Sequence, residues 1–213
     1  MADIFREIED DLKHEHYRRL WQRYGKWVLA VAIVLVLGTA AAVGWREYQT
    51  SQRIEESAAY ASALAAVGVA PEEADAALAT LADKGGVYGA LARLERAGVA
   101  ARAGNHADAA MQYRAIADDG DIDPVLRELA LTQWATQALA AGENPAAIET
   151  AMTPLAEGDS AWRHMARELL AVLALQNGDT AQARELFGTL ADDPETPQSM
   201  RARASEALAA LAE

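Results

Sequence analysis

The chain has 213 residues and a formal net charge of −13, all of it in residues 46–213, because residues 1–45 hold six basic and six acidic side chains. Such an acidic domain repels phosphate backbones, which excludes nucleic acid as the expected partner. The chain has no cysteine, which excludes disulfides, thiol nucleophiles and thiolate metal sites.

The first predicted elements are a short helical segment, residues 1–26, and an apolar helix. Nineteen residues without a charge follow Lys26, from Trp27 to Trp45 (WVLAVAIVLVLGTAAAVGW). A helix of this length covers about 28 Å, close to the hydrocarbon thickness of a bilayer. Tryptophan at each end suits the headgroup level. We therefore predict one transmembrane helix over residues 27–45, with Trp27 and Trp45 as the ends of the anchor.

A cleaved secretion signal is the main alternative for this helix, because residues 39–42 are small and alanine-rich. The 26 residues that precede the apolar stretch and the length of that stretch favour an uncleaved anchor. Six Lys and Arg residues precede it, and only Arg46 and Arg53 lie in the twenty residues that follow. This charge bias predicts a cytoplasmic segment (1–26), a membrane span (27–45) and an exported domain (46–213).

The exported domain is predicted to be all-α, because alanine is abundant there and is the best helix former. The first helix-breaking residues after the span are Gly68 and Pro71, so the span should continue as a helix to about Val67. Beyond them, loop signals separate segments of roughly 13–18 residues with helical apolar spacing. Capping side chains before prolines predict helix starts at Asp123–Pro124, Asn144–Pro145 and Thr196–Pro197.

These segments form an internal repeat marked by Gly104, Gly142 and Gly178, which lie 38 and 36 residues apart. Aligning the chain on these glycines gives columns of small residues (Ala97, Ala135, Ala171; Ala100, Ala138, Ala174; Ala109, Ala147, Ala183) and of mostly larger ones (Tyr113, Ala151, Phe187; Tyr88, Leu126, Trp162). Small columns opposite large ones are typical of stacked antiparallel helices. We predict an α-solenoid of about four helix pairs with a C-terminal capping helix over residues 197–212.

The repeat length, the small columns and the Gly-Asx turns resemble the tetratricopeptide repeat, with alanine at 97, 135 and 171 where that repeat usually has glycine. The N-terminal span followed by SQRIEESAAYASAL and by VYGALARLE at residues 87–95 resembles the YfgM family of bacterial inner-membrane proteins. That resemblance implies a single-pass inner-membrane protein with a periplasmic domain. It also implies association with the Sec translocon and periplasmic chaperones, with no cofactor and no catalytic residues.

The residues themselves offer no catalytic arrangement, and we predict that the protein is not an enzyme and takes no metal or small-molecule substrate. His106 and His164 are expected to be structural or solvated. The predicted partner-binding groove lies on the first helices of the pairs and includes Tyr88, Arg93, Arg127, Trp134, Trp162, Arg163 and Arg167, residue types that dominate interface energies. Core packing for the two tryptophans, and a solvated face or surface ion pairs for the arginines, are the alternatives.

The favoured function is a membrane-anchored interaction module at the translocon that serves chaperones during protein export. One alternative is a scaffold for another envelope assembly, such as cell division or outer-membrane biogenesis. Another is a self-associating membrane spacer, suggested by small residues four apart in the span, Gly38 with Ala42 and Ala40 with Gly44.

Overall fold

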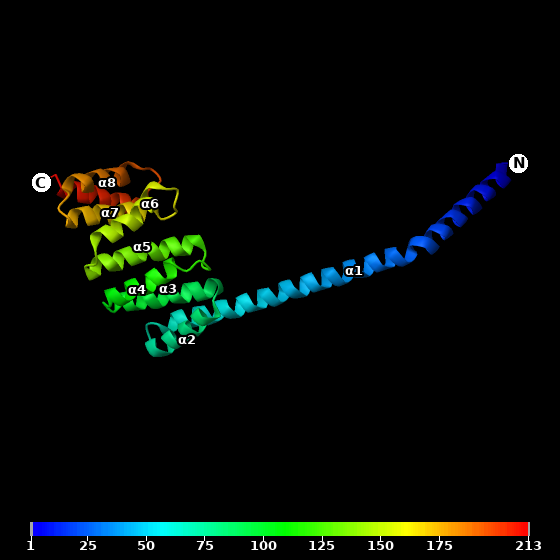
Figure 1. Cartoon of the computed structure of the whole chain (residues 1–213), viewed down its shortest axis with the longest axis horizontal. Helices are drawn as coiled ribbons and strands as arrows, with labels where there is room; N and C mark the ends of the chain where they lie inside the picture. The colour runs from blue at the N-terminus through cyan, green and yellow to red at the C-terminus, as the bar shows by residue number, and fades with distance from the viewer. Residues whose placement is uncertain (1, 213) are drawn as a thin grey trace. The chain divides into compact units, whose positions relative to one another are not determined.

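The computed structural model describes the backbone of residues 2–212 and the side chains of residues 23–212 apart from 25, 28 and 32. Most side chains of the predicted segment 1–26 therefore lie outside the described residues. Within residues 2–212 the chain forms α-helices and no strand, which confirms the all-α prediction. The helices are α1 (Ala2–Ala66), α2 (Pro71–Lys84), α3 (Gly86–Arg102), α4 (His106–Ala117), α5 (Pro124–Ala141), α6 (Pro145–Glu157), α7 (Arg163–Gln176), α8 (Thr180–Asp192) and α9 (Gln198–Ala210) (Figure 1).

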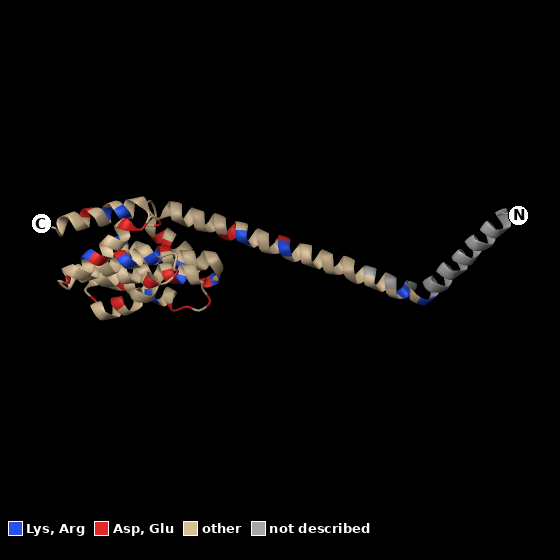
Figure 2. Ribbon diagram, turned by 90° about the horizontal axis from the view of Figure 1, so that it is seen from above, with Lys and Arg blue, Asp and Glu red and all other residues tan. Residues whose placement is uncertain are grey.

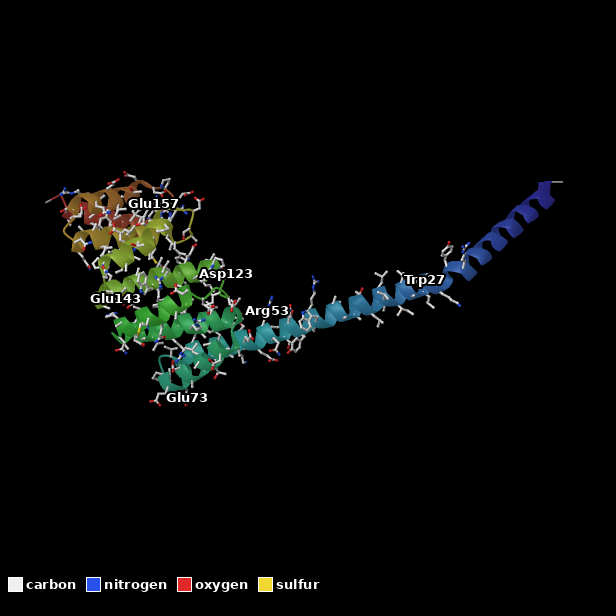
Figure 3. All side chains as sticks on the ribbon, viewed as in Figure 1. Trp27, Arg53, Glu73, Asp123, Glu143 and Glu157 are labelled. Carbon is white, nitrogen blue, oxygen red and sulfur yellow. The ribbon has the colours of Figure 1, made fainter. Side chains whose placement is uncertain are left out.

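The chain divides into two compact units, residues 1–55 and 56–213. The first unit contains the apolar stretch of α1, whose ribbon shows neither acidic nor basic colour in Figure 2. Its described side chains are exposed, including Trp27 at the start and Trp45 at the end (Figure 3 labels Trp27). The Thr39 hydroxyl donates to the Leu35 carbonyl at 2.7 Å, so the polar group of this stretch is satisfied within the helix.

By length and composition, α1 is the one helix among the described residues that could cross a membrane. An N-terminal secretion signal would pass the same test. The helix continues without a break to Ala66, one residue short of the predicted end.

The second unit stacks its helices in pairs, as the repeat predicts. The end of α1 packs with α2, then α3 pairs with α4, α5 with α6 and α7 with α8, while α9 packs on α8. The first contact is a small cluster in which Ala63 of α1 meets Leu78 and Leu81 of α2 and Ala92 of α3. One pair cannot bury its apolar side alone, so successive pairs share a continuous core.

The repeat glycines end the first helix of three pairs in the same way. Gly104, Gly142 and Gly178 have φ of +79°, +74° and +79°, a left-handed conformation that glycine adopts without strain. In each turn the residue after the glycine donates its N–H to the carbonyl of an alanine in the last helical turn, Ala100, Ala138 or Ala174, at 2.8–3.0 Å. This capping pattern is why the Gly-Asx signal recurs along the chain.

The alanine columns allow the helices to approach each other closely. Ala97, Ala135 and Ala171 in the first helices are fully buried. The second helices place large residues against the first helices, and the largest fully buried side chains include Leu78 of α2, Ile116 of α4, Ile148 and Met152 of α6, and Leu190 of α8. Small residues on one helix and large ones on the next fill the core at close to crystalline density.

One predicted column is wrong in the middle pair. Ala147 is exposed, whereas its counterparts Ala109 and Ala183 are buried, and Ile148 fills the core position instead. The cause is the turn after Gly142, which is one residue longer, so that α6 begins three residues after its glycine while α4 and α8 begin two residues after theirs. The extra residue shifts the buried face of α6 along the sequence.

Two of the three predicted capping starts are confirmed. The side chain of Asp123 accepts the N–H of Val125 at 2.9 Å, and that of Asn144 accepts the N–H of Ala146 at 3.0 Å. The third is wrong, because Pro197 occupies the cap of α9 without a side-chain bond. The hydroxyl of Thr196 bonds to His164 instead.

Candidate interaction site

The seven predicted groove residues lie in α3, α5 and α7 or, for Trp162, at the cap of α7. The structure distributes them into different environments. Trp134 belongs to the core, two pairs of contacts surround Arg93 and Arg167, and Tyr88, Arg127 and Trp162 remain partly exposed.

Trp134 is a packing residue and is not on the surface. Its side chain is only 6 % exposed and sits in the main core cluster. The guanidinium carbon of Arg114 lies 5.0 Å from the ring centroid, which adds a cation–π contact to the edge of that cluster. The groove assignment of Trp134 is therefore corrected, because a ring enclosed by helices cannot contact a partner without unpacking them.

Arg93 joins α3 to the loop after α4. Its Nη1 lies 2.5 Å from Oδ2 of Asp119, and its Nη2 donates to the carbonyl of Ala115 at 3.2 Å. The other oxygen of Asp119 accepts the backbone N–H of Asp121 at 3.1 Å. One carboxylate thus fixes both the arginine and the loop. The hydrogen bond from Arg93 holds the pKa of Asp119 below its usual value.

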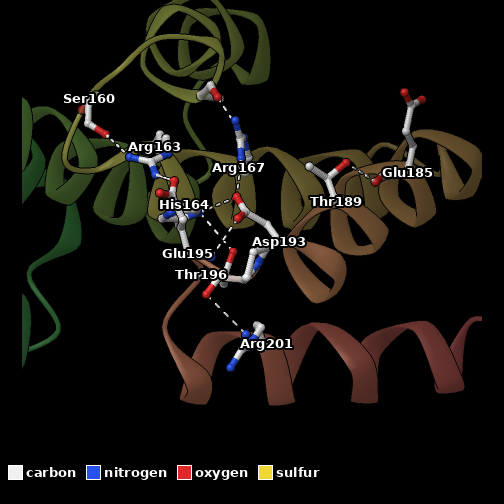
Figure 4. Close-up of polar contacts among 12 residues, drawn as sticks. Ser160, Arg163, His164, Arg167, Glu185, Thr189, Asp193, Glu195, Thr196 and Arg201 are labelled. Atoms are coloured by element: carbon white, nitrogen blue, oxygen red, sulfur yellow. Dashed lines mark hydrogen bonds and ion pairs between the residues drawn. The ribbon is translucent and has the colours of Figure 1, made fainter.

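Arg167 makes the corresponding contact two pairs later (Figure 4). Its Nη1 lies 3.5 Å from Oδ2 of Asp193, and the other Asp193 oxygen accepts the N–H of Glu195 at 2.9 Å. Both arginine–aspartate pairs are 26 residues apart, and both begin 11 residues before a repeat glycine, Gly104 or Gly178. The contact is therefore a feature of the repeat. In the middle pair Leu131 occupies the arginine position.

The start of α7 is also tied to its neighbours. The indole N–H of Trp162 donates to the Val125 carbonyl at the start of α5, at 3.0 Å. Arg163 forms an ion pair with Glu195 at 2.6 Å. Trp162 and Arg163 thus connect successive pairs, and Trp162 keeps part of its surface open to solvent.

Arg127 occupies the position in α5 that Arg163 occupies in α7, 15 residues before the repeat glycine. Its Nε is buried and has no hydrogen-bond partner among the described side chains and backbone. A buried donor without an acceptor is unfavourable by about 1–3 kcal/mol. Arg127 is therefore the candidate whose hydrogen-bonding capacity the fold uses least.

Tyr88 packs its ring against Tyr60 of α1, with centroids 6.0 Å apart and planes tilted by 49°. It keeps part of its surface exposed, and the neighbouring Val87 is 63 % exposed. Val125 is 50 % exposed at the equivalent position of α5. Tyr88, Arg127 and Trp162, with these two valines, form the starts of the first helices, and we call them the helix-start surface.

The two histidines of the repeat unit are both hydrogen-bonded. Nδ1 of His106 lies 2.8 Å from Oε1 of Gln137, and Nδ1 of His164 lies 3.1 Å from the Thr196 hydroxyl. Over the side chains that the structure describes, no three His, Asp or Glu residues are placed to hold a metal ion. The oxygens of Asp119 are likewise engaged by Arg93 and a backbone N–H.

The Asp119 contact predicts a pH dependence of stability. Because the folded-state pKa of Asp119 is below the usual 3.8, its stabilisation is present above that value and is lost as the pH falls through the folded pKa. We expect Asp119→Asn to melt below wild type at about pH 6, with the difference shrinking towards about pH 3. Circular dichroism melts across this range measure it. Asp121→Asn removes an exposed carboxylate and is the control; a constant difference for Asp119→Asn would contradict the prediction.

Comparison with known proteins identifies the fold. The family model for the tetratricopeptide repeat-like domain matches residues 18–193, from before the apolar stretch to the loop after α8. Neither the comparison with curated proteins nor that with solved structures gave a match. Helical repeats of this kind are protein-interaction scaffolds and are typically non-catalytic. Because the match covers well over half of the chain, the protein belongs to the tetratricopeptide repeat-like domain family.

Proposed function

We propose that this protein is a single-pass inner-membrane protein of the YfgM-like type, with residues 1–26 in the cytoplasm and residues 46–213 in the periplasm. Its repeat domain would bind proteins at the Sec translocon and periplasmic chaperones during protein export. The observation that carries the proposal is the order of elements: a basic segment, the uncharged stretch from Trp27 to Trp45, and a repeat domain. One family match includes the last two together.

The anchor supplies the mechanism. A single span confines the repeat domain to one face of the membrane, which raises its effective concentration near the translocon without any new contact. A positive-inside orientation places that domain on the exit side. Stacked helix pairs then offer a surface suited to an extended or helical segment of a partner.

The helix-start surface is the part of the repeat that we assign to partner contact. Arg93, Arg163 and Arg167 already bind acidic residues of the chain, so using them would break existing ion pairs. Arg127 has an unused buried donor, and Tyr88 and Trp162 are partly exposed aromatic rings. Aromatic residues and arginine commonly dominate interface energies.

Photo-crosslinking from Val125 in the intact membrane tests this proposal. Val125 is half exposed beside Arg127, whereas Glu143 lies beyond the opposite end of α5 (Figure 3) and provides the control position. We expect adducts with translocon subunits or periplasmic chaperones from position 125 and few from position 143. Adducts only with unrelated envelope proteins would contradict a role in export. Unchanged export of a secreted reporter after depletion would favour the envelope scaffold.

Arg127→Ala is expected to lower recovery of the crosslinked or co-purified partner by at least about fivefold, the ratio that corresponds to about 1 kcal/mol. The fold should tolerate the change, because it removes a donor that has no acceptor in the free protein. Quantitative mass spectrometry of the purified full chain measures the ratio. Arg102→Ala is the matched control, since Arg102 is exposed at the other end of α3. Equal losses for both variants would remove Arg127 from the interface.

A further inference from the structure

His164 lies in the first turn of α7 and faces the segment between α8 and α9 (Figure 4). Its side chain is buried, with Nδ1 3.1 Å from the hydroxyl of Thr196 and 3.7 Å from Oδ2 of Asp193. Thr196 is itself only 2 % exposed. We call these three residues the α9 junction.

The α9 junction fixes the start of the capping helix. Thr196 immediately precedes Pro197, the cap of α9, and Asp193 is the cap that ends α8. From α9, the side chain of Arg201 donates back to the carbonyl of Pro194 at 3.4 Å. The helix held in this way covers the terminal core cluster, where Met200 and Ala204 pack with residues that include Phe187 and Leu190 of α8.

Other pairs place different residues at the His164 and Thr196 positions. In the pair before, Glu128 accepts the hydroxyl of Ser160 at 2.8 Å, and in the first of the three the same positions hold Ala90 and Ile122, both buried. All three contacts join a first helix to a residue 32 positions later. Only the last of them contains a side chain that titrates near neutral pH. The chain thus provides its own internal controls.

The charges that face His164 come from two elements. Arg163 and Arg167 belong to α7, and Asp193 and Glu195 belong to the segment between α8 and α9. Burial, followed by the positive charge of Arg163, lowers the pKa of His164 below its usual 6.5, and the nearby carboxylates offset only part of this effect. The neutral ring is therefore the form that suits the docked structure.

We propose that the α9 junction is a pH-sensitive contact, in which neutral His164 holds the start of α9 and protonation in mildly acidic solution releases it. A neutral ring protonated at Nε2 accepts the Thr196 hydroxyl hydrogen at Nδ1. The imidazolium has no acceptor, so Thr196 loses this partner and a charge is left between two arginines. Release of α9 would uncover Phe187 and Leu190, an apolar surface that becomes available for partners only in acid.

The direction of the effect follows from proton linkage. When α9 is released, His164 reaches solvent and recovers an ordinary pKa, so the released form binds protons at a higher pH than the docked form. Docking is therefore strongest above about 6.5 and weakens as the pH falls through that value. The carboxylates of the other pairs titrate well below this window.

Hydrogen exchange on the full chain in detergent micelles, at about pH 7.5 and about pH 5.5, tests the proposal once rates are corrected for intrinsic exchange. We expect amides of residues 195–203 to lose protection at the lower pH. Residues 121–126, whose contact uses Ala90 and Ile122, should keep theirs. Equal protection of residues 195–203 at the two pH values would overturn the proposal.

His164→Gln supplies the matched variant, because its amide can accept the Thr196 hydroxyl and does not titrate in this range. We expect it to keep α9 protected at both pH values, while His106→Gln keeps the wild-type response. A His164→Gln chain that still loses protection in acid would overturn the proposal. An imidazole titration of wild-type His164 by NMR is independent of any variant, and a midpoint at or above 6.5 would also overturn it.

Discussion

Replacing Leu35 and Leu37 together by arginine is expected to release the full chain from membranes under alkaline carbonate extraction, whereas wild type stays in the membrane pellet. Both leucines lie in the middle of the uncharged stretch, where each arginine disfavours insertion by about 2.5–3.5 kcal/mol. Both side chains are 64 % exposed, so the substitution removes little packing within the protein. The effect would therefore report on lipid insertion.

Thr50→Arg together with Ser51→Arg adds the same charge outside the span and should leave the chain in the pellet. The intact mass of the wild-type chain separates an anchor from a cleaved signal, since cleavage near residues 39–42 would remove the N-terminal segment. A reporter fused to the C-terminus should be active only outside the cytoplasm. Retention of the double-arginine variant in the pellet would remove the support for a span at 27–45.

The parts of the fold that the sequence predicts well obey local rules. Gly104, Gly142 and Gly178 end helices because glycine adopts a positive φ without strain, and this holds in any surroundings. Asp123 and Asn144 cap the next N–H groups within their own turns. Such signals need no knowledge of the neighbouring helices, so both the helix boundaries and the repeat could be found from residue types alone.

The errors arise where tertiary packing decides. Whether Trp134 faces the core depends on how α5 crosses its neighbours, which residue type does not specify. The column offered a usable signal, because Leu170 occupies the equivalent position of α7 and is buried. Similarly, Ala147 and Ile148 exchange roles through a one-residue change in the preceding turn. A fixed alignment on the glycines cannot detect that shift.

The ion pairs of the site could have been found by extending the alignment further. Arg93 and Asp119 occupy the same repeat positions as Arg167 and Asp193, so opposite charges recur at a fixed separation. The sequence comparison stopped at the columns nine residues after the glycines and did not reach these aspartates. Recurring opposite charges indicate a contact within the fold, which is why these arginines hold loops and Arg127 is left for a partner.

Leu190→Ala is expected to lower the free energy of unfolding by about 2–5 kcal/mol, because Leu190 is fully buried and its loss leaves a cavity between α8 and the helices beside it. Met111→Ala removes a side chain of comparable size that is 65 % exposed on α4, and should change stability by about 0.5 kcal/mol or less. Guanidinium unfolding of the full chain, followed by far-ultraviolet circular dichroism, measures both. A Leu190→Ala change as small as that of Met111→Ala would contradict the packing.

The shape of the transition carries a further expectation, since stability in a helical repeat is a sum over pairs and their nearest neighbours. Leu190 lies in the last pair, which has the capping helix on one side and a single pair on the other, so Leu190→Ala should unfold α7–α9 ahead of the rest and broaden the transition. Ile148 is equally buried but belongs to the middle pair. Weakening a pair that has neighbours on both sides, by Ile148→Ala, should lower the midpoint while the transition stays single.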